Sequence, residues 1–300
     1  MKINRIRQNV LPVLAAFIWG TAFVAQSVGA DYVEPFTFNA ARSAIAFLFL
    51  LALCLVRRKV QKGVVPSATR SWKDLAIGGA CCGTALTVAS NLQQKGLETT
   101  TSGKAGFITA LYIVIVPILS IFLRKKAPRA IWLSVALAVA GLYCLCITED
   151  FTITGGDFYI LLCALCFSVH ILVIDHFTQR VDGVELSCAQ FLVVTLLSAA
   201  GMLATESPSP EALALCAWPI LYVGIFSSGV AYTPQILAQK DSNPTVVSLL
   251  LSLESVFATL AGAILLHDQM SGKEYLGCVL MLAAVVLAQL PEREKTAAEA

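Results

Sequence analysis

Charged side chains are scarce in this 300-residue chain. They make up 13% of it, about half the share found in a typical soluble domain. Hydrophobic residues make up 57%, and the mean hydropathy is +0.77. So little charge cannot cover a surface that faces water, which argues against a soluble enzyme, a nucleic-acid-binding protein and a disordered scaffold. The composition predicts an all-α integral membrane protein whose surroundings are the lipid bilayer.

Several motifs that carry chemistry are also missing. Cys163 and Cys166 form a C-x-x-C pair, but no second pair and no histidine cluster completes a metal site. No Gly-x-x-x-x-Gly-Lys-Ser/Thr loop occurs, which argues against an ATP-driven pump. No Ser-Lys or Asp-Asp pair on one helix face suggests an enzyme, and no pore-loop sequence suggests a channel. We therefore predict no enzyme activity, no cofactor and no metal.

Long hydrophobic runs dominate the sequence. A membrane helix needs about 20 mostly apolar residues, and the runs predict ten such helices with short loops between them. The predicted spans are residues 10–28, 36–56, 75–93, 102–123, 131–147, 157–174, 184–203, 212–238, 245–266 and 275–290. No stretch between them is long enough for a separate soluble domain.

Lysine and arginine are distributed unequally between the loops. With the N-terminus in the cytoplasm, seventeen of them fall on the cytoplasmic side, and only Lys95, Lys104 and Lys273 fall outside. The cytoplasmic set includes the N-terminal tail and the clusters at residues 57–73 and 124–129. Cytoplasmic loops of membrane proteins carry such an excess of positive charge. This distribution predicts a multi-pass protein of the cell (plasma or inner) membrane with both termini in the cytoplasm.

The two halves of the chain also resemble each other in sequence. A shift of 148 residues aligns Ala40-Ala41-Arg42 with Cys188-Ala189-Gln190, and residues 16–20 with 164–168. Shifts of 145 and 143 align 92–95 with 237–240 and 132–134 with 275–277. These matches predict two five-helix repeats, residues 1–148 and 149–300. Because five is odd, the second repeat enters the membrane from the opposite side, which is the inverted arrangement of many secondary transporters.

Local motifs add a family resemblance. Residues 15–20 read AAFIWG, Pro35 begins a helix that contains Arg42, and Gly156-Asp157 opens the sixth span. Residues 252–256 read SLESV, and residues 102–117 read SGKAGFITALYIVIVP. These segments resemble the EamA-type family of the drug/metabolite transporter superfamily, with Ser255 where that family usually has proline. The resemblance covers about residues 8–290 and implies the ten-helix fold and a transport function.

Three ionisable residues inside the predicted spans are the first candidates for a substrate pathway: Arg42, Lys104 and Glu254. A charge in hydrocarbon is costly unless it is paired or faces water. In the functional interpretation, Glu254 attracts an ammonium group or a proton while Arg42 or Lys104 holds a carboxylate. In the structural interpretation, Arg42 and Lys104 extend to the outer surface, or Glu254 forms a buried pair with one of them.

Polar and aromatic residues within the spans form a second group of candidates. Amides need partners in lipid and so either bridge helices or face the pathway. A mid-membrane tryptophan can stack on a substrate, tyrosine offers a hydroxyl, and a lone histidine either packs or relays a proton. This group contains Trp19, Asn39, Asn91, Gln94, Tyr112, His170, Gln190, Tyr232 and Gln235.

Together these observations predict a secondary transporter that works by alternating access. We expect the substrate to be a small polar metabolite, an amino acid or a related compound, moved by export or exchange. A membrane-embedded transferase and a drug-efflux carrier are the alternatives. The two repeats complete a pathway within one chain, so no obligate protein partner is expected.

Overall fold

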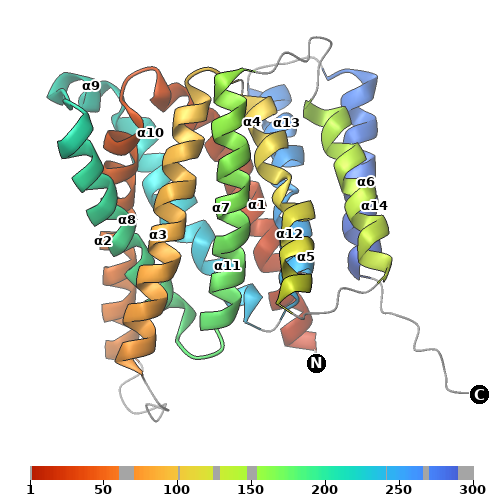
Figure 1. Cartoon of the computed structure of the whole chain (residues 1–300), viewed down its shortest axis with the longest axis horizontal. Helices are drawn as coiled ribbons and strands as arrows, with labels where there is room; N and C mark the ends of the chain where they lie inside the picture. The colour runs from red at the N-terminus through yellow and green to blue at the C-terminus, as the bar shows by residue number, and fades with distance from the viewer. Residues whose placement is uncertain are drawn as a thin grey trace, which may run out of the picture.

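The computed structural model of this protein describes residues 2–60, 71–100, 102–123, 129–146, 154–240, 242–265 and 270–289, which form helices and connecting turns without a strand. The helices stand side by side (Figure 1). In the first half they are α1 (Lys2–Ala30), α2 (Pro35–Val60), α3 (Trp72–Leu97), α4 (Ser102–Ala110), α5 (Tyr112–Phe122) and α6 (Arg129–Cys146). In the second half they are α7 (Gly155–Phe177), α8 (Gly183–Thr205), α9 (Pro210–Leu215), α10 (Ala217–Tyr222), η1 (Val223–Ala231), α11 (Tyr232–Gln239), α12 (Pro244–Leu251), α13 (Glu254–Leu265) and α14 (Gly272–Gln289).

Local capping residues set several helix starts. Thr154 precedes α7 and accepts a hydrogen bond from the backbone N–H of Asp157, whose carboxylate accepts one from the N–H of Thr154. The carboxylate of Asp182 accepts bonds from the first backbone N–H groups of α8, and Asn243 precedes Pro244 at the start of α12. Each arrangement satisfies donors that a helix N-terminus leaves free.

The prediction of an all-α membrane protein is confirmed. Eight helical stretches of the described chain are long and apolar enough to cross a bilayer, and a shorter apolar helix covers Ile131–Leu145. Large apolar side chains cover the outside of the bundle, such as Leu48 at 62% exposure, Phe122 at 80% and Leu203 at 78%. Such a surface would be unstable in water but suits contact with lipid.

Three predicted spans are not continuous helices. The span 102–123 is interrupted at Leu111, between α4 and α5, and the span 245–266 is interrupted at Ser252 and Leu253, between α12 and α13. The span 212–238 contains the short helices α9 and α10, the π-helix η1 and α11. Non-helical or strained backbone inside a membrane protein is tolerated where protein or a cavity surrounds it. Sequence runs of apolar residues do not reveal such interruptions.

The two ends of the bundle differ in what they carry. We call the side on which α1 begins and α14 ends the terminal face, and the opposite side the far face (Figure 1). The helix α1 runs toward the far face, whereas α7, the first helix of the second half, runs toward the terminal face. Arg57, Arg58 and Lys59 lie in the last turn of α2, on the terminal face.

Parts of the sequence predictions fall on residues that are not described. The repeat boundary at 148/149 lies within residues 147–153, outside the described residues. The same holds for Lys62, Arg70, Arg124, Lys125, Lys126, Arg293 and Lys295. Which face meets the cytoplasm therefore stays a prediction.

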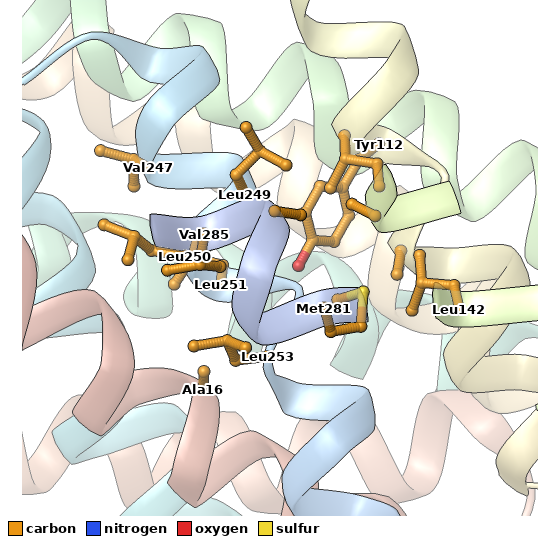
Figure 2. Close-up of a cluster of buried hydrophobic side chains, with 14 of the residues drawn as sticks. Ala16, Tyr112, Leu142, Val247, Leu249, Leu250, Leu251, Leu253, Met281 and Val285 are labelled. Carbon is orange, nitrogen blue, oxygen red and sulfur yellow. The ribbon is translucent and has the colours of Figure 1, made fainter. Parts of the chain in front are cut away.

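The two halves interleave. The helix α2 packs along α8, α6 along α14, and α3 along α7, while α1 packs against α10, η1, α11 and α13. In the repeat, α1 is equivalent to α7, and α3 is equivalent to η1 with α11. The contact between α3 and α7 therefore has an equivalent in the contact of α1 with η1 and α11, as an inverted repeat requires. The largest apolar cluster joins both halves and includes Leu142, Leu250 and Met281 (Figure 2). Any cavity near the centre is consequently built by both halves.

Candidate functional site

A cavity lies between the halves. Seven of the residues predicted from the sequence line it: Trp19, Arg42, Tyr112, His170, Tyr232, Gln235 and Glu254. The remaining lining residues are Phe23, Gln26, Gln93, Thr109, Phe167, Ile171, Ser227 and Leu251. They come from α1, α2, α3, α4, α5, α7, η1, α11, α12 and α13. The cavity thus combines charged, polar and aromatic groups, as expected for a small-molecule site.

The two interrupted helices meet at this cavity. Tyr112 is the first residue of α5 and Glu254 is the first residue of α13, so each follows its interruption directly. The Tyr112 hydroxyl donates a hydrogen bond to Glu254 Oε1 at 3.1 Å. Figure 2 shows Tyr112 beside the apolar cluster that supports it. Interrupted helices that meet at mid-membrane are typical of substrate sites in transporters.

Gly20 allows α1 to approach the start of α13. A Cβ atom at this position would lie 2.6 Å from the carbonyl oxygen of Glu254 and 2.8 Å from the backbone nitrogen of Ala258. No side chain fits at such distances without moving the backbone of α13. The Trp19-Gly20 pair therefore places an aromatic ring in the cavity and keeps the segment that carries Glu254 close to α1.

Arg42 supplies the positive charge. It is 6% exposed, and its Nη1 donates a hydrogen bond to Gln26 Oε1 at 2.8 Å. Its guanidinium also lies over the Phe38 ring, 5.6 Å from the centroid. Within the described part of the chain, neither Arg42 nor Glu254 has an ion-pair partner. A buried charge without a partner is costly, so both charges are available to a ligand.

Aromatic rings form one wall of the cavity. Trp19 and Tyr232 make an edge contact with centroids 4.8 Å apart, and Tyr232 in turn contacts Phe191 and His170. Trp19 Nε1 donates a hydrogen bond to the carbonyl oxygen of Ser227, which belongs to the π-helix η1. The π-helix therefore supplies the acceptor that holds the tryptophan ring in place. π-helical segments occur often at functional sites.

His170 and Gln190 form a buried pair between α7 and α8. His170 Nε2 lies 3.0 Å from Gln190 Oε1, and both side chains are fully buried. His170 lines the cavity, whereas Gln190 lies behind it. Gln190 is thus placed to orient the histidine ring.

Three predicted amides bridge helices. Asn39 Nδ2 donates to Asn91 Oδ1 at 3.0 Å, and Asn91 Nδ2 donates to Ser198 Oγ at 3.2 Å, so these residues link α2, α3 and α8. Gln94 Nε2 donates to the backbone oxygen of Gln26 at 2.9 Å. None of the three lines the cavity. Their positions match the bridging role that the sequence left open.

Lys104 lies in an ion pair away from the cavity. Its Nζ is 2.5 Å from Asp157 Oδ2, with side-chain exposures of 14% and 7%. Asp157 also accepts a hydrogen bond from Thr100. The lysine therefore joins α4 to the start of α7 and does not pair with Glu254. Sequence reasoning considered Lys104 and Asp157 separately, because only the fold brings the two residues together.

Several cavity residues were not predicted. Gln26 accepts the hydrogen bond of Arg42, and Gln93 Nε2 donates to Thr109 Oγ1 at 3.3 Å. Gln26 and Gln93 are amides inside apolar helices, the same signal that selected Gln94 and Gln190. Counting every amide in the spans would have found them. Phe23, Phe167 and Ser227 have no distinguishing signal among the many apolar and small residues.

Residues 8–147 and 154–290 each match the sequence model of the EamA-like transporter family. An uncharacterized transporter of Archaeoglobus fulgidus is 30% identical over 293 residues, covering 96% of this chain and 87% of the relative. A WAT1-related chloroplastic protein of Arabidopsis thaliana is 24% identical over 294 residues, covering 92% and 68%. A solved crystal structure, 20% identical, shares the fold with a TM-score of 0.77 over 94% of this chain and 96% of that chain.

Proposed function

The chain belongs to the EamA-like transporter family, and we propose that this membrane transporter carries a small zwitterionic metabolite, an amino acid or a related compound. The resemblance of its helix motifs to that family is thereby confirmed. We further propose secondary transport by alternating access, with both termini in the cytoplasm of the cell and with export or exchange as the direction.

One observation carries the substrate proposal: Arg42 and Glu254, of opposite charge, line the same cavity without an ion-pair partner among the described residues. A guanidinium matches a carboxylate with two parallel hydrogen bonds. A carboxylate beside a tyrosine hydroxyl, as at Glu254 and Tyr112, accepts the N–H groups of an ammonium. A zwitterion provides both groups and removes the cost of leaving two buried charges uncompensated.

Alternating access is supported by the arrangement of the halves. Residues of both halves line the cavity, and the contact between α3 and α7 has an equivalent in the contact of α1 with η1 and α11. Rocking of one inverted repeat against the other exposes a central site to each side in turn. The excess of lysine and arginine expected on the terminal face supports the placement of that face in the cytoplasm.

Counterflow in proteoliposomes tests the proposal. Unlabelled amino acid inside the vesicles should accelerate the entry of labelled amino acid, which a carrier does and an enzyme or a channel does not. Replacement of Glu254 by glutamine, Glu254→Gln, should leave the protein folded and strongly reduce exchange. Glu211→Gln, at an exposed glutamate of α9, is the matched control and should exchange like the parent protein. Unchanged exchange by Glu254→Gln across pH would contradict the role of this carboxylate.

Arg42→Lys tests the carboxylate contact. Lysine keeps the charge but loses the planar fork, so transport of a carboxylate-bearing substrate should weaken by about tenfold, roughly 1.4 kcal/mol. An amine that lacks the carboxylate should be affected little. Equal transport of both compounds by Arg42→Lys and the parent protein would instead indicate a purely structural arginine.

The aromatic wall supports a second candidate, a drug-efflux carrier. Trp19, Tyr232 and Glu254 line the cavity together, and a cation that stacks on aromatic rings is a suitable ligand for such a set. Faster exchange of aromatic amines than of amino acids, unaffected by Arg42→Lys, would favour this candidate.

A further inference from the structure

Three side chains that line the cavity each carry a buried polar atom without a hydrogen-bond partner among the described residues: Arg42 Nε, His170 Nδ1 and Gln235 Oε1. Their side chains are 6%, 0% and 2% exposed. Nearly all buried polar groups in proteins are hydrogen-bonded, and a buried group left without a partner is costly. These three atoms are therefore the places where a ligand would complete the site.

The three atoms lie toward different ends of the cavity. Arg42 lies in the second turn of α2, which begins on the far face. His170 lies in the last third of α7, and Gln235 lies in α11; both helices end on the terminal face. The cavity thus has an Arg42 end toward the far face and a His170–Gln235 end toward the terminal face.

The two ends also differ in hydrogen-bond character. Arginine only donates, so the Arg42 end takes an anion or another acceptor. The Gln235 oxygen only accepts. With the ring proton of His170 on Nε2, which lies 3.0 Å from the Gln190 oxygen, Nε2 donates to that oxygen and Nδ1 presents a lone pair. The His170–Gln235 end therefore presents two free acceptors, in addition to the Glu254 carboxylate.

His170 and Gln235 lie on α7 and α11, which pack against each other, whereas Glu254 lies on α13, which packs mainly against α1. We propose that His170 and Gln235 are specificity-determining residues that select substrates with a second hydrogen-bond donor, such as a side-chain hydroxyl, amide or amine, beyond the ammonium bound by Glu254. This inference rests on the proposed function and narrows the substrate class to polar amino acids and close analogues. A site built to bind a donor rejects an analogue without one, because its buried acceptors stay unpaired.

Threonine and valine provide the test, since they share a shape and differ by one hydroxyl donor. Binding to the full chain is measured by thermal unfolding in detergent over a series of ligand concentrations, and transport by counterflow. Threonine should bind at least about tenfold more tightly than valine. Gln235→Leu and His170→Phe should each weaken threonine binding toward the valine level while leaving valine binding nearly unchanged.

Gln239→Leu is the matched control, because Gln239 is also a buried glutamine of α11 but bonds the backbone of Ile171 at 2.8 Å and does not line the cavity. It should keep the preference for threonine. Equal binding of threonine and valine by the parent protein, or a preference that survives both cavity variants, would overturn the inference but leave the proposed function standing. If no amino acid stabilises the protein or drives exchange, the proposed function fails as well.

Discussion

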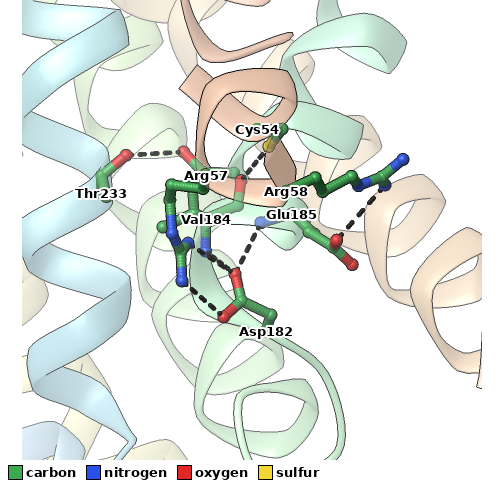
Figure 3. A network of polar contacts seen from close by, with 8 residues as sticks. Cys54, Arg57, Arg58, Asp182, Val184, Glu185 and Thr233 are labelled. Atoms are coloured by element: carbon green, nitrogen blue, oxygen red, sulfur yellow. Dashed lines mark hydrogen bonds and ion pairs between the residues drawn. The ribbon is translucent and has the colours of Figure 1, made fainter. Parts of the chain in front are cut away.

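The contact between α2 and α8 is held differently at its two ends. On the terminal face, Arg57 Nη1 lies 3.1 Å from Asp182 Oδ1, and Arg58 Nη2 lies 3.3 Å from Glu185 Oε1 (Figure 3). These side chains are 19–46% exposed. Ion pairs at such exposure contribute about 0–1 kcal/mol each, because water and salt screen them.

On the far face, a single carboxylate binds a helix start. Glu206, which directly follows α8, accepts hydrogen bonds from the backbone N–H of Phe36 at 2.8 Å and of Thr37 at 2.6 Å. It also accepts one from the Thr37 hydroxyl at 2.7 Å. Hydrogen bonds to a charged group contribute about 1.5–3 kcal/mol, and a carboxylate at a helix N-terminus also interacts favourably with the helix dipole.

The shift of 148 residues that aligns Arg42 with Gln190 also aligns Arg58 with Glu206. Equivalent positions of the two halves thus hold the same helix pair by different chemistry, exposed ion pairs at one end and a partly buried helix cap at the other. The difference teaches that an inverted repeat need not give equal stability at its two faces. We expect the terminal-face end to separate more easily, and the following changes test this.

The largest effect is expected for Glu206→Ala. It removes all three hydrogen bonds at the start of α2, so the free energy of unfolding should fall by about 2 kcal/mol, the upper end of the range for the loss of a helix N-cap. Thermal unfolding in detergent measures the change. Glu211→Ala, at an exposed position of α9, should unfold like the parent protein. An equal Tm for Glu206→Ala, Glu211→Ala and the parent would show that the Glu206 hydrogen bonds do not stabilise the far-face end of the contact between α2 and α8.

Asp182→Ala should have the next largest effect. Asp182 pairs with Arg57 and also accepts hydrogen bonds from the backbone N–H of Val184 at 3.0 Å and of Glu185 at 3.2 Å. Loss of a helix N-cap costs about 1 kcal/mol. Asp182→Asn keeps an acceptor for the cap and loses only the ion pair, so it should cost less than Asp182→Ala. Equal losses would mean that the ion pair, not the cap, stabilises this end.

Acid should weaken the terminal-face end further. Burial alone would raise the pKa of Asp182, but the hydrogen bonds from Arg57 and the backbone outweigh it and hold the pKa below its usual range. A carboxyl with a lowered folded pKa stabilises the protein above its unfolded pKa, about 3.9, and loses this contribution as the pH falls through the folded value. The Tm difference between the parent and Asp182→Asn should therefore shrink below about pH 4. A constant difference across that range would contradict this assignment.

The smallest effect is expected for Arg58→Gln. The Arg58–Glu185 pair is exposed, with the arginine side chain 46% accessible, so its loss should cost no more than a few tenths of a kcal/mol. High salt should abolish even this difference, since salt screens exposed charges. A loss as large as that of Glu206→Ala would show that the two ends are held equally.

Much of the fold was predictable because it depends on local and compositional physics. Apolar run length places the helices, and caps such as Thr154 with Asp157 place their starts. The interruption at Leu111 was not predictable, since no glycine or proline marks it and Tyr112 and Glu254 meet only in the folded bundle. The π-helix likewise depends on its contacts with α1 and α2.

Residues of the candidate site were predictable from the sequence where the side chain alone is costly to place in an apolar membrane helix. Arg42 and Glu254 stand out as charges in apolar helices, and both line the cavity. Lys104 stands out equally, yet its partner Asp157 comes from the other half of the chain. Depth and partner decide between a structural and a functional charge, and both are properties of the tertiary arrangement. For the same reason, the sequence could not separate the bridging Asn91 from the cavity-lining Gln235.

The interleaving of the halves has a consequence for biosynthesis. The helix α1 packs against α10, η1, α11 and α13, which the ribosome begins to make about 190 to 220 residues after the end of α1. At about 5–20 residues per second, α1 waits roughly 10–40 s for these neighbours. Throughout that interval Trp19 lacks its hydrogen bond to Ser227 and its contact with Tyr232, whereas the partners of Gln26, Arg42 and Gln94, belong to the first half. The first half of the chain is thus an assembly intermediate, and the cavity forms only when the second half has been inserted, because residues of both halves line it.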